Sequence, residues 1–196
     1  YKTIKIVNIV KYGMNIKMEY NKLTSNFLDK EERNNILDYI TNNPLYKDYD
    51  NKKGFSITYK IDEVPQFLNK FKDKKFNVYN FIGLYTFKNG SIAPHVDCDL
   101  LTYIKTKVNP RFIIGYPETI VYYADVCEYM KGGDLIVDNE KFKPVTNSAI
   151  KMEKGKVHRV TEVIDYKRPR LVLVCERYNI LEKYYNKLNT PIERQG

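Results

Sequence analysis

Two stretches in the first part of the chain place apolar residues at helical spacing. The first, LDKEERNNILDYI, contains Asp29 with Glu32 three residues later, which is the arrangement of an N-terminal capping box. Ile36, Leu37 and Ile40 then recur on one face. The pattern predicts a first helix over this segment.

The second stretch, DEVPQFLNKFKD, carries an apolar stripe with the i, i+3, i+4, i+7 spacing of a helix that packs on a flat surface. The stripe consists of Val64, Phe67, Leu68 and Phe71. We therefore predict a second helix, and we expect Phe67 and Phe71 to belong to the core that faces a sheet.

From Phe76 onward, short runs of β-branched and aromatic residues alternate with turn signals such as KNGS and KGGD. The runs are FNVYNFIGLYTF, TIVYYADV, LIV, AIKM, VHRVTEV and RLVLVCERY. Strands and helices do not alternate here, so antiparallel sheets are expected. The pattern predicts an α+β protein whose core, over about residues 76–178, is a cupin-like jelly-roll barrel (a double-stranded β-helix). N-terminal helices would support it, mainly within residues 1–75, while segments 42–60 and 98–118 are expected to be loops beside its mouth.

The composition suits one compact domain over residues 1–196, because 43% of the residues are hydrophobic and can fill a single large core. Three scattered cysteines without a CxxC pair favour a reducing compartment over a disulfide scaffold or zinc ribbon. The apolar runs are far shorter than the ~20 residues of a membrane span. We expect a soluble, cytoplasmic protein with no membrane partner. The sequence leaves open its oligomeric state and, because it begins with Tyr1, whether an N-terminal segment was removed.

The net charge of +9 raises the question of a nucleic-acid partner. Lysine, asparagine, isoleucine and tyrosine are all abundant, and an AT-rich genome produces this joint bias without any binding function. The lysines are also spread along the chain. We interpret the charge mainly as solvated surface, with a basic groove as the alternative.

Candidate chemistry centres on the only two histidines of the chain. In PHVDCD, His95 stands two positions before Asp97, and alternate residues of an extended strand point to the same face. His158 lies in a predicted late strand and is a candidate third ligand. Two imidazoles and one carboxylate form the facial set that holds non-haem Fe(II) and leaves three coordination positions open. We predict that these three residues bind a metal ion, although a lone histidine is more often an ordinary, partly buried side chain.

An arginine follows the second histidine at a suggestive distance. Arg170, in KRPRLVLV, comes 12 residues after His158 and could reach a carboxylate bound beside the metal, because arginine forms two parallel hydrogen bonds to carboxylates. Arg168 has the same strand parity and is the alternative. In the purely structural interpretation, both are ordinary surface residues of a strand.

Together, these features resemble the Fe(II)- and 2-oxoglutarate-dependent oxygenases over roughly residues 80–178. The prolyl-4-hydroxylase-like branch is the most similar, because a tyrosine in LYTFKNGSIAPHVD, a YY pair before a GG turn, and a histidine followed by a basic residue occur in this order. The resemblance implies that His95, Asp97 and His158 are the iron ligands. It also implies that Tyr85, ten residues before His95, contacts 2-oxoglutarate through its hydroxyl.

The resemblance gives roles to later residues as well. It implies that Tyr123 lines the cosubstrate pocket, that Gly132 and Gly133 form a tight turn, and that Arg170 pairs with the distal carboxylate of 2-oxoglutarate. In the family, the gap between the histidine and this arginine is usually a little shorter. Arg168 fits that gap better, whereas the RPRL context favours Arg170.

The implied activity is that of a dioxygenase, a hydroxylase that uses Fe(II), 2-oxoglutarate and O2, with ascorbate as a candidate reductant. The expected substrate is a protein or peptide side chain, with proline first. Two alternatives are a metal-binding cupin without 2-oxoglutarate and a nucleic-acid demethylase or hydroxylase of the same superfamily. The demethylases carry two arginines with five residues between them on the last core strand. Here six residues separate Arg170 from Arg177, which puts the two on opposite faces of a regular strand.

Overall fold

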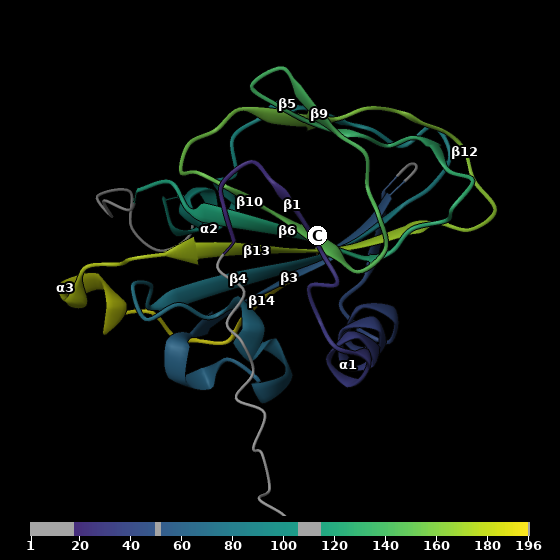
Figure 1. Ribbon diagram of the computed structural model, residues 1–196. Coiled ribbons are helices and arrows are strands. Elements are labelled where there is room, and N and C mark those ends of the chain that lie inside the picture. Colours follow the sequence, from purple (N-terminus) through teal and green to yellow (C-terminus); the bar gives the residue numbers. More distant parts are fainter. Residues whose placement is uncertain (1–17, 50–51, 106–114, 196) are drawn as a thin grey trace, which may run out of the picture.

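The computed structural model describes residues 18–49, 52–105 and 115–195. Their strands form three antiparallel sheets (Figure 1). The largest has eight strands in the order β1-β10-β6-β13-β4-β3-β14, with β2 paired to β3. A second sheet has the order β5-β11-β8-β9, and β12 and β7 form a short third sheet.

The strands of the large sheet are β1 (Leu23–Ser25), β2 (Lys47–Tyr49), β3 (Lys52–Lys60), β4 (Val78–Thr86), β6 (Glu118–Asp125), β10 (Ser148–Met152), β13 (Arg170–Tyr178) and β14 (Ile192–Gln195). The smaller sheets contain β5 (Ile92–His95), β7 (Lys131–Gly132), β8 (Leu135–Val137), β9 (Glu140–Phe142), β11 (His158–Val160) and β12 (Val163–Asp165). The helices are α1 (Lys30–Thr41), α2 (Asp99–Tyr103), α3 (Glu182–Tyr185) and the 3-10 helices η1 (Ile61–Glu63) and η2 (Gln66–Phe71).

The first predicted helix is confirmed as α1. The side chain of Asp29 accepts a hydrogen bond from the backbone N–H of Glu32, and the Glu32 side chain accepts one from the backbone N–H of Asp29. This capping box satisfies donors that the first turn would otherwise leave unpaired. Ile36 and Ile40 are fully buried, so this face of α1 is anchored to the core beneath the large sheet.

The large sheet has an apolar core on each face, as strand alternation requires. On one side, Tyr122 of β6 packs with Phe71 and Phe81 in the cluster that α1 and η2 cover. On the other side, the neighbouring β6 residues Val121 and Tyr123 join a cluster shared with the four-stranded sheet. Figure 1 shows α1 below the large sheet and β5 and β9 above it.

The predicted strand-rich, jelly-roll-like architecture is confirmed, with two sheets that pack face to face. The predicted double-stranded β-helix barrel is not confirmed in this detail, because the sheets remain open in the described part of the chain. The strand runs predicted after Phe76 correspond to strands in the structure, and the run VHRVTEV is divided between β11 and β12.

The predicted helical character of the first 75 residues is wrong in two places. Pro65 keeps Val64 extended, with ψ 121°, so the predicted second helix is divided into the 3-10 segments η1 and η2. Its apolar stripe nevertheless reaches the core, since Phe71 is fully buried and Phe67 packs against the same cluster. The segment 42–60, expected as loop, contains the strands β2 and β3, and β3 pairs along its whole length with β4. The segment 98–118, also expected as loop, contains α2, and its residues 106–114 lie outside the described residues.

No helix among the described residues is both long enough and apolar enough to cross a membrane.

Candidate metal centre

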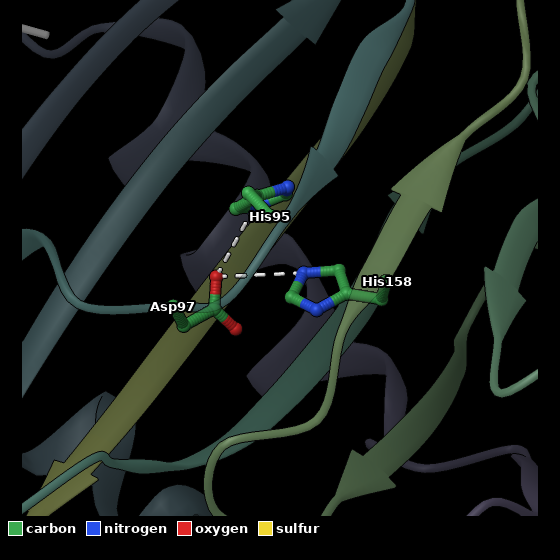
Figure 2. Close-up of side chains that lie close together, drawn as sticks. All are labelled: His95, Asp97 and His158. Atoms are coloured by element: carbon green, nitrogen blue, oxygen red, sulfur yellow. Dashed lines mark ion pairs between the residues drawn. The ribbon is translucent and has the colours of Figure 1, made fainter.

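Two antiparallel strands of the four-stranded sheet bring the histidines together. His95 at the end of β5 is the direct register partner of His158 at the start of β11. Their ring centroids lie 4.3 Å apart. Asp97 follows β5 by two residues, and its Oδ1 lies 3.4 Å from Nε2 of each histidine (Figure 2). The predicted His-Asp-His set is therefore assembled in space.

Hydrogen bonds on the far side of each ring fix which nitrogen faces the centre. Nδ1 of His95 donates to the carbonyl of Ala93 at 2.9 Å, and Nδ1 of His158 donates to the carbonyl of Lys156 at 3.2 Å. Because a carbonyl only accepts, both Nδ1 atoms carry hydrogen, and in the neutral ring Nε2 then offers its lone pair. This is the outer support that ligating histidines typically have.

The three side chains fit a divalent metal ion. Their ligand atoms all lie within 4.8 Å of one another. Bonds of about 2.1 Å at right angles would place neighbouring ligand atoms about 3 Å apart, close to the observed nitrogen–oxygen separations. The two-imidazole, one-carboxylate set is the one that suits non-haem Fe(II).

The electrostatics of the three groups also favour a cation between them. Burial raises the pKa of the Asp97 carboxyl, but its hydrogen bonds from His158 and His95 outweigh burial and hold the pKa well below its usual range. The hydrogen bond to Asp97 raises the pKa of His95. Asp97 is therefore an anion beside two imidazoles, and a metal ion bound between the three groups would balance its charge.

A pocket of about 380 Å³ opens beside the three ligands. Its walls are mainly aliphatic, and its polar groups include Asp99, Thr102 and Glu176 besides the ligands themselves. The side chain of His158 is 6% exposed and that of His95 39% exposed, so the centre is shielded on one side and open on the other.

Glu176 is a site residue that the sequence analysis missed. It is fully buried on β13, and its Oε2 accepts hydrogen bonds of 2.8 Å from the Asn80 amide and the Tyr178 hydroxyl. Burial, reinforced by the charge of Asp97, raises the pKa of Glu176 to about 7. Strand parity was an available signal, because Glu176 lies six residues after Arg170 and so shares its face of β13.

Arg170 lies between the two sheets and is 2% exposed. Its Nη1 donates to the carbonyl of Gly133 at 2.6 Å and its Nη2 to the hydroxyl of Thr86 at 3.3 Å. Gly133 has φ +69°, consistent with the predicted glycine turn. Burial lowers the pKa of this guanidinium, and its Nε has no partner among the described residues. Arg170 is thus a buried cation for which the structure describes no carboxylate partner.

Arg168 occupies a different environment. It precedes β13 and is exposed, and it makes two hydrogen bonds to the carboxylate of Asp125, at 2.6 and 2.9 Å. Asp125 raises the pKa of Arg168 further above its ordinary value. The predicted alternative is therefore already engaged in an ion pair away from the space between the sheets.

The two predicted tyrosines are separated by the sheet. Tyr123 is 1% exposed within the core between the sheets, where burial raises its pKa to about 12 and the nearby charge of Arg170 opposes that rise. Tyr85 packs in the cluster on the opposite face, edge-on to Tyr46 with ring centroids 5.1 Å apart. Tyr85 is not among the residues that line the pocket, because strand alternation turns its neighbour Leu84 toward the pocket instead. The contact between Tyr85 and 2-oxoglutarate stays a prediction.

The ligand set and Arg170 are not in one continuous cavity. The residues that line the pocket include Val174 and Glu176 of β13 but neither Arg170 nor Tyr123. Arg170 lies farther along the same face of β13, past Val172.

No protein-family model matches this sequence, and no curated protein matches it significantly. Solved structures are similar in fold. A 2OG-Fe(II) oxygenase family oxidoreductase from Burkholderia pseudomallei gives a TM-score of 0.54 at 15% identity, covering 79% of this chain and 81% of that one. A prolyl-4-hydroxylase from Pseudomonas putida gives 0.54 at 12% identity, covering 81% and 91%. The resemblance predicted from the sequence is confirmed as a shared fold.

Proposed function

We propose that the protein is an Fe(II)- and 2-oxoglutarate-dependent dioxygenase that hydroxylates a protein or peptide side chain, with a prolyl residue as the first candidate. The observation that carries this proposal is the convergence of Nε2 of His95, Nε2 of His158 and Oδ1 of Asp97 at the edge of a pocket. Bound Fe(II), with 2-oxoglutarate and O2, would supply the oxidation that inserts one oxygen atom into a substrate C–H bond.

The contribution of the chain is to bind, orient and shield. The carbonyls of Ala93 and Lys156 hold the two imidazoles in the tautomer that presents Nε2. The aliphatic walls of the pocket limit the access of water, which strengthens each charge interaction inside it. None of these roles requires an acid–base pair or a nucleophile.

Arg170 supports the assignment of 2-oxoglutarate as cosubstrate. A buried guanidinium without an ion pair in the described structure is costly, and a bound dicarboxylate would supply the missing anion. A metal-binding cupin that does not use 2-oxoglutarate would have no need of this cation. The cosubstrate would have to displace side chains between Arg170 and the pocket, such as Val172, because the two are not joined here.

We propose a peptide rather than a nucleic acid as the substrate. Arg177 forms an ion pair with Glu118 and packs on Phe76 at the opposite face of the sheet from Arg170, so the two arginines do not share a site. The similarity in fold to an oxidoreductase named as a prolyl-4-hydroxylase makes proline the first side chain to test.

The test is mass spectrometry of a proline-containing peptide library and of methylated single-stranded oligonucleotides, each incubated with the protein, Fe(II), 2-oxoglutarate and O2. We expect peptides to gain one oxygen atom only when all three components are present. If the oligonucleotides were demethylated and the peptides remained unchanged, nucleic acid would replace peptides as the proposed substrate class.

A further inference from the structure

Glu176 lines the pocket beside the candidate metal ligands and has one buried carboxylate oxygen without a hydrogen-bond partner in the described structure. The residue is fully buried and lines that pocket. Oε2 accepts hydrogen bonds from Asn80 and Tyr178, whereas Oε1 has no hydrogen-bond partner within the described structure. An unpaired buried carboxylate oxygen is costly, so this oxygen is placed to receive a donor from outside the chain.

A network of hydrogen bonds fixes the position of the Glu176 carboxylate. The Asn80 amide that donates to Glu176 is itself fixed through its Oδ1, which accepts from Nη2 of Arg194 at 2.9 Å and from the Thr58 hydroxyl at 3.0 Å. The side chain of Glu176 is therefore preorganised, which lowers the cost of binding a ligand to it.

Arg194, which holds the Asn80 amide, forms no ion pair with Glu176 in the described structure. Nη1 of Arg194 pairs with Oδ2 of Asp99 at 2.9 Å, so its charge is already shared with another carboxylate. Among the described residues, Glu176 takes part in no ion pair.

The other residues that line the pocket indicate which kind of hydrogen-bond donor could bind to Glu176. Its lining residues include three carboxylates and, within the described ranges, no lysine or arginine. The remaining wall is largely aliphatic and includes Ile82, Leu84, Ile92, Val121 and Val174. An aliphatic wall that leads to a carboxylate complements a side chain with a methylene stem and a cationic end.

We propose that this pocket receives a lysine or arginine side chain of the peptide substrate, with its ammonium or guanidinium bound to Oε1 of Glu176. This inference rests on the proposed function, because it specifies the peptide that the oxygenase would accept. A prolyl residue inside a chain has no N–H and cannot supply the donor. A prolyl substrate would therefore carry a basic residue nearby.

The experiment measures binding of matched fluorescent peptides to the Mn(II)- and 2-oxoglutarate-loaded protein by anisotropy. Each proline-containing peptide carries one lysine or arginine at a successive position, and its partner carries norleucine or citrulline there, which removes the charge. For the best position, we expect the wild-type protein to prefer the cation by roughly 10- to 100-fold, the range of a charge-assisted hydrogen bond to a buried group. Glu176→Gln should abolish this preference.

The control is Glu140→Gln, which changes an exposed glutamate of β9 that is not among the residues lining the pocket and should keep the full preference. Equal binding of charged and neutral peptides to the wild-type protein would overturn the proposal, and that comparison decides even if Glu176→Gln fails to fold. The proposal would also be overturned if a folded Glu176→Gln variant lost affinity for the charged and the neutral peptide to the same extent.

Consumption of 2-oxoglutarate with Fe(II) separates this inference from the proposed function. A charge preference without any consumption would contradict the oxygenase and keep the basic-side-chain pocket. Consumption without a charge preference would keep the oxygenase and remove the pocket assignment.

Discussion

His95 and His158 stand opposite each other in direct register on β5 and β11, and both aim Nε2 at the same oxygen of Asp97 (Figure 2). The pairing of two strands sets this arrangement, and a backbone carbonyl holds each ring. The three candidate ligands are therefore already positioned in the protein alone, which would reduce the cost of binding a metal ion.

Removing one ligand should abolish tight metal binding while the fold remains. His158→Ala and Asp97→Ala each delete one of three ligands, and the two cores of the large sheet do not depend on them. Calorimetric titration with Fe(II) under anaerobic conditions measures the loss, and circular dichroism checks the fold. Asp165→Ala is the matched control, because Asp165 is an exposed aspartate of β12 outside the pocket lining and its loss should leave the affinity for Fe(II) unchanged. Wild-type affinity in Asp97→Ala would remove Asp97 from the ligand set.

Arg170→Ala should weaken the binding of 2-oxoglutarate and leave the binding of metal intact. Loss of a bidentate pair with a carboxylate in a shielded site costs roughly 2 to 4 kcal/mol, or on the order of 30-fold to several hundred-fold in affinity. Arg168→Ala should have a much smaller effect, because Arg168 is exposed and pairs with Asp125. Calorimetry with the Mn(II)-loaded variants measures both. If the two results are exchanged, Arg168 is the cosubstrate residue.

Glu176 should make the metal-free protein less stable as pH rises. Its pKa is about 7 in the folded protein against 4.5 ordinarily, so between these values the folded state holds a proton that the unfolded state has released. The contribution of Glu176 to the free energy of unfolding is therefore fully present below pH 4.5. It is lost as the pH rises to 7, and a pKa shift of this size corresponds to a loss of about 3 kcal/mol. Denaturant unfolding of wild type and Glu176→Gln at several pH values measures the difference. If the difference in free energy of unfolding between wild type and Glu176→Gln stays the same from pH 4.5 to pH 7, the raised pKa of Glu176 is contradicted.

Phe71→Ala should destabilise the fold strongly, although the residue ends only a short 3-10 helix. Its ring is fully buried and lies 5.5 to 6.0 Å from the rings of Phe27, Phe81 and Tyr122. Removing a buried aromatic ring costs about 3 to 5 kcal/mol. Phe67→Ala provides the comparison and should cost less, because Phe67 is only partly buried. Chemical denaturation gives both values, and equal losses would mean that η2 is not anchored through Phe71.

The sequence was sufficient to predict that His95, Asp97 and His158 lie together, because residues of this kind are few in the chain and two of them are close in the sequence. The chain has only two histidines, and the two-residue spacing of His95 and Asp97 already brings an imidazole and a carboxylate close together. The sequence could not show that Tyr85 packs on the face of the sheet opposite the pocket, because motif spacing does not specify which face of a strand a residue occupies, and a shift of one residue reverses the face. Glu176 was missed because its importance depends on burial beside Asp97, which the fold creates.

The fold was predictable where patterns are strong and less so where long-range pairing decides. The capping box of α1 and the strands after Phe76 follow local signals. In contrast, β3 begins with Lys52, Lys53 and Gly54, which the sequence suggests as a loop. These residues form a strand because β4 pairs with one edge of β3, while β2 and then β14 pair with the other. Local propensity is a weak guide in such cases.

The most direct test of the oxygenase assignment is an anaerobic titration of the wild-type protein with Fe(II) and then 2-oxoglutarate, followed by visible absorption. A 2-oxoacid that chelates Fe(II) gives a charge-transfer band that neither component gives alone. We predict that this band appears with the wild-type protein, saturates at one equivalent of Fe(II) and is absent in Asp97→Ala. Binding of Fe(II) to His95, Asp97 and His158 with no band on addition of 2-oxoglutarate would contradict the assignment and leave a metal-binding cupin in its place.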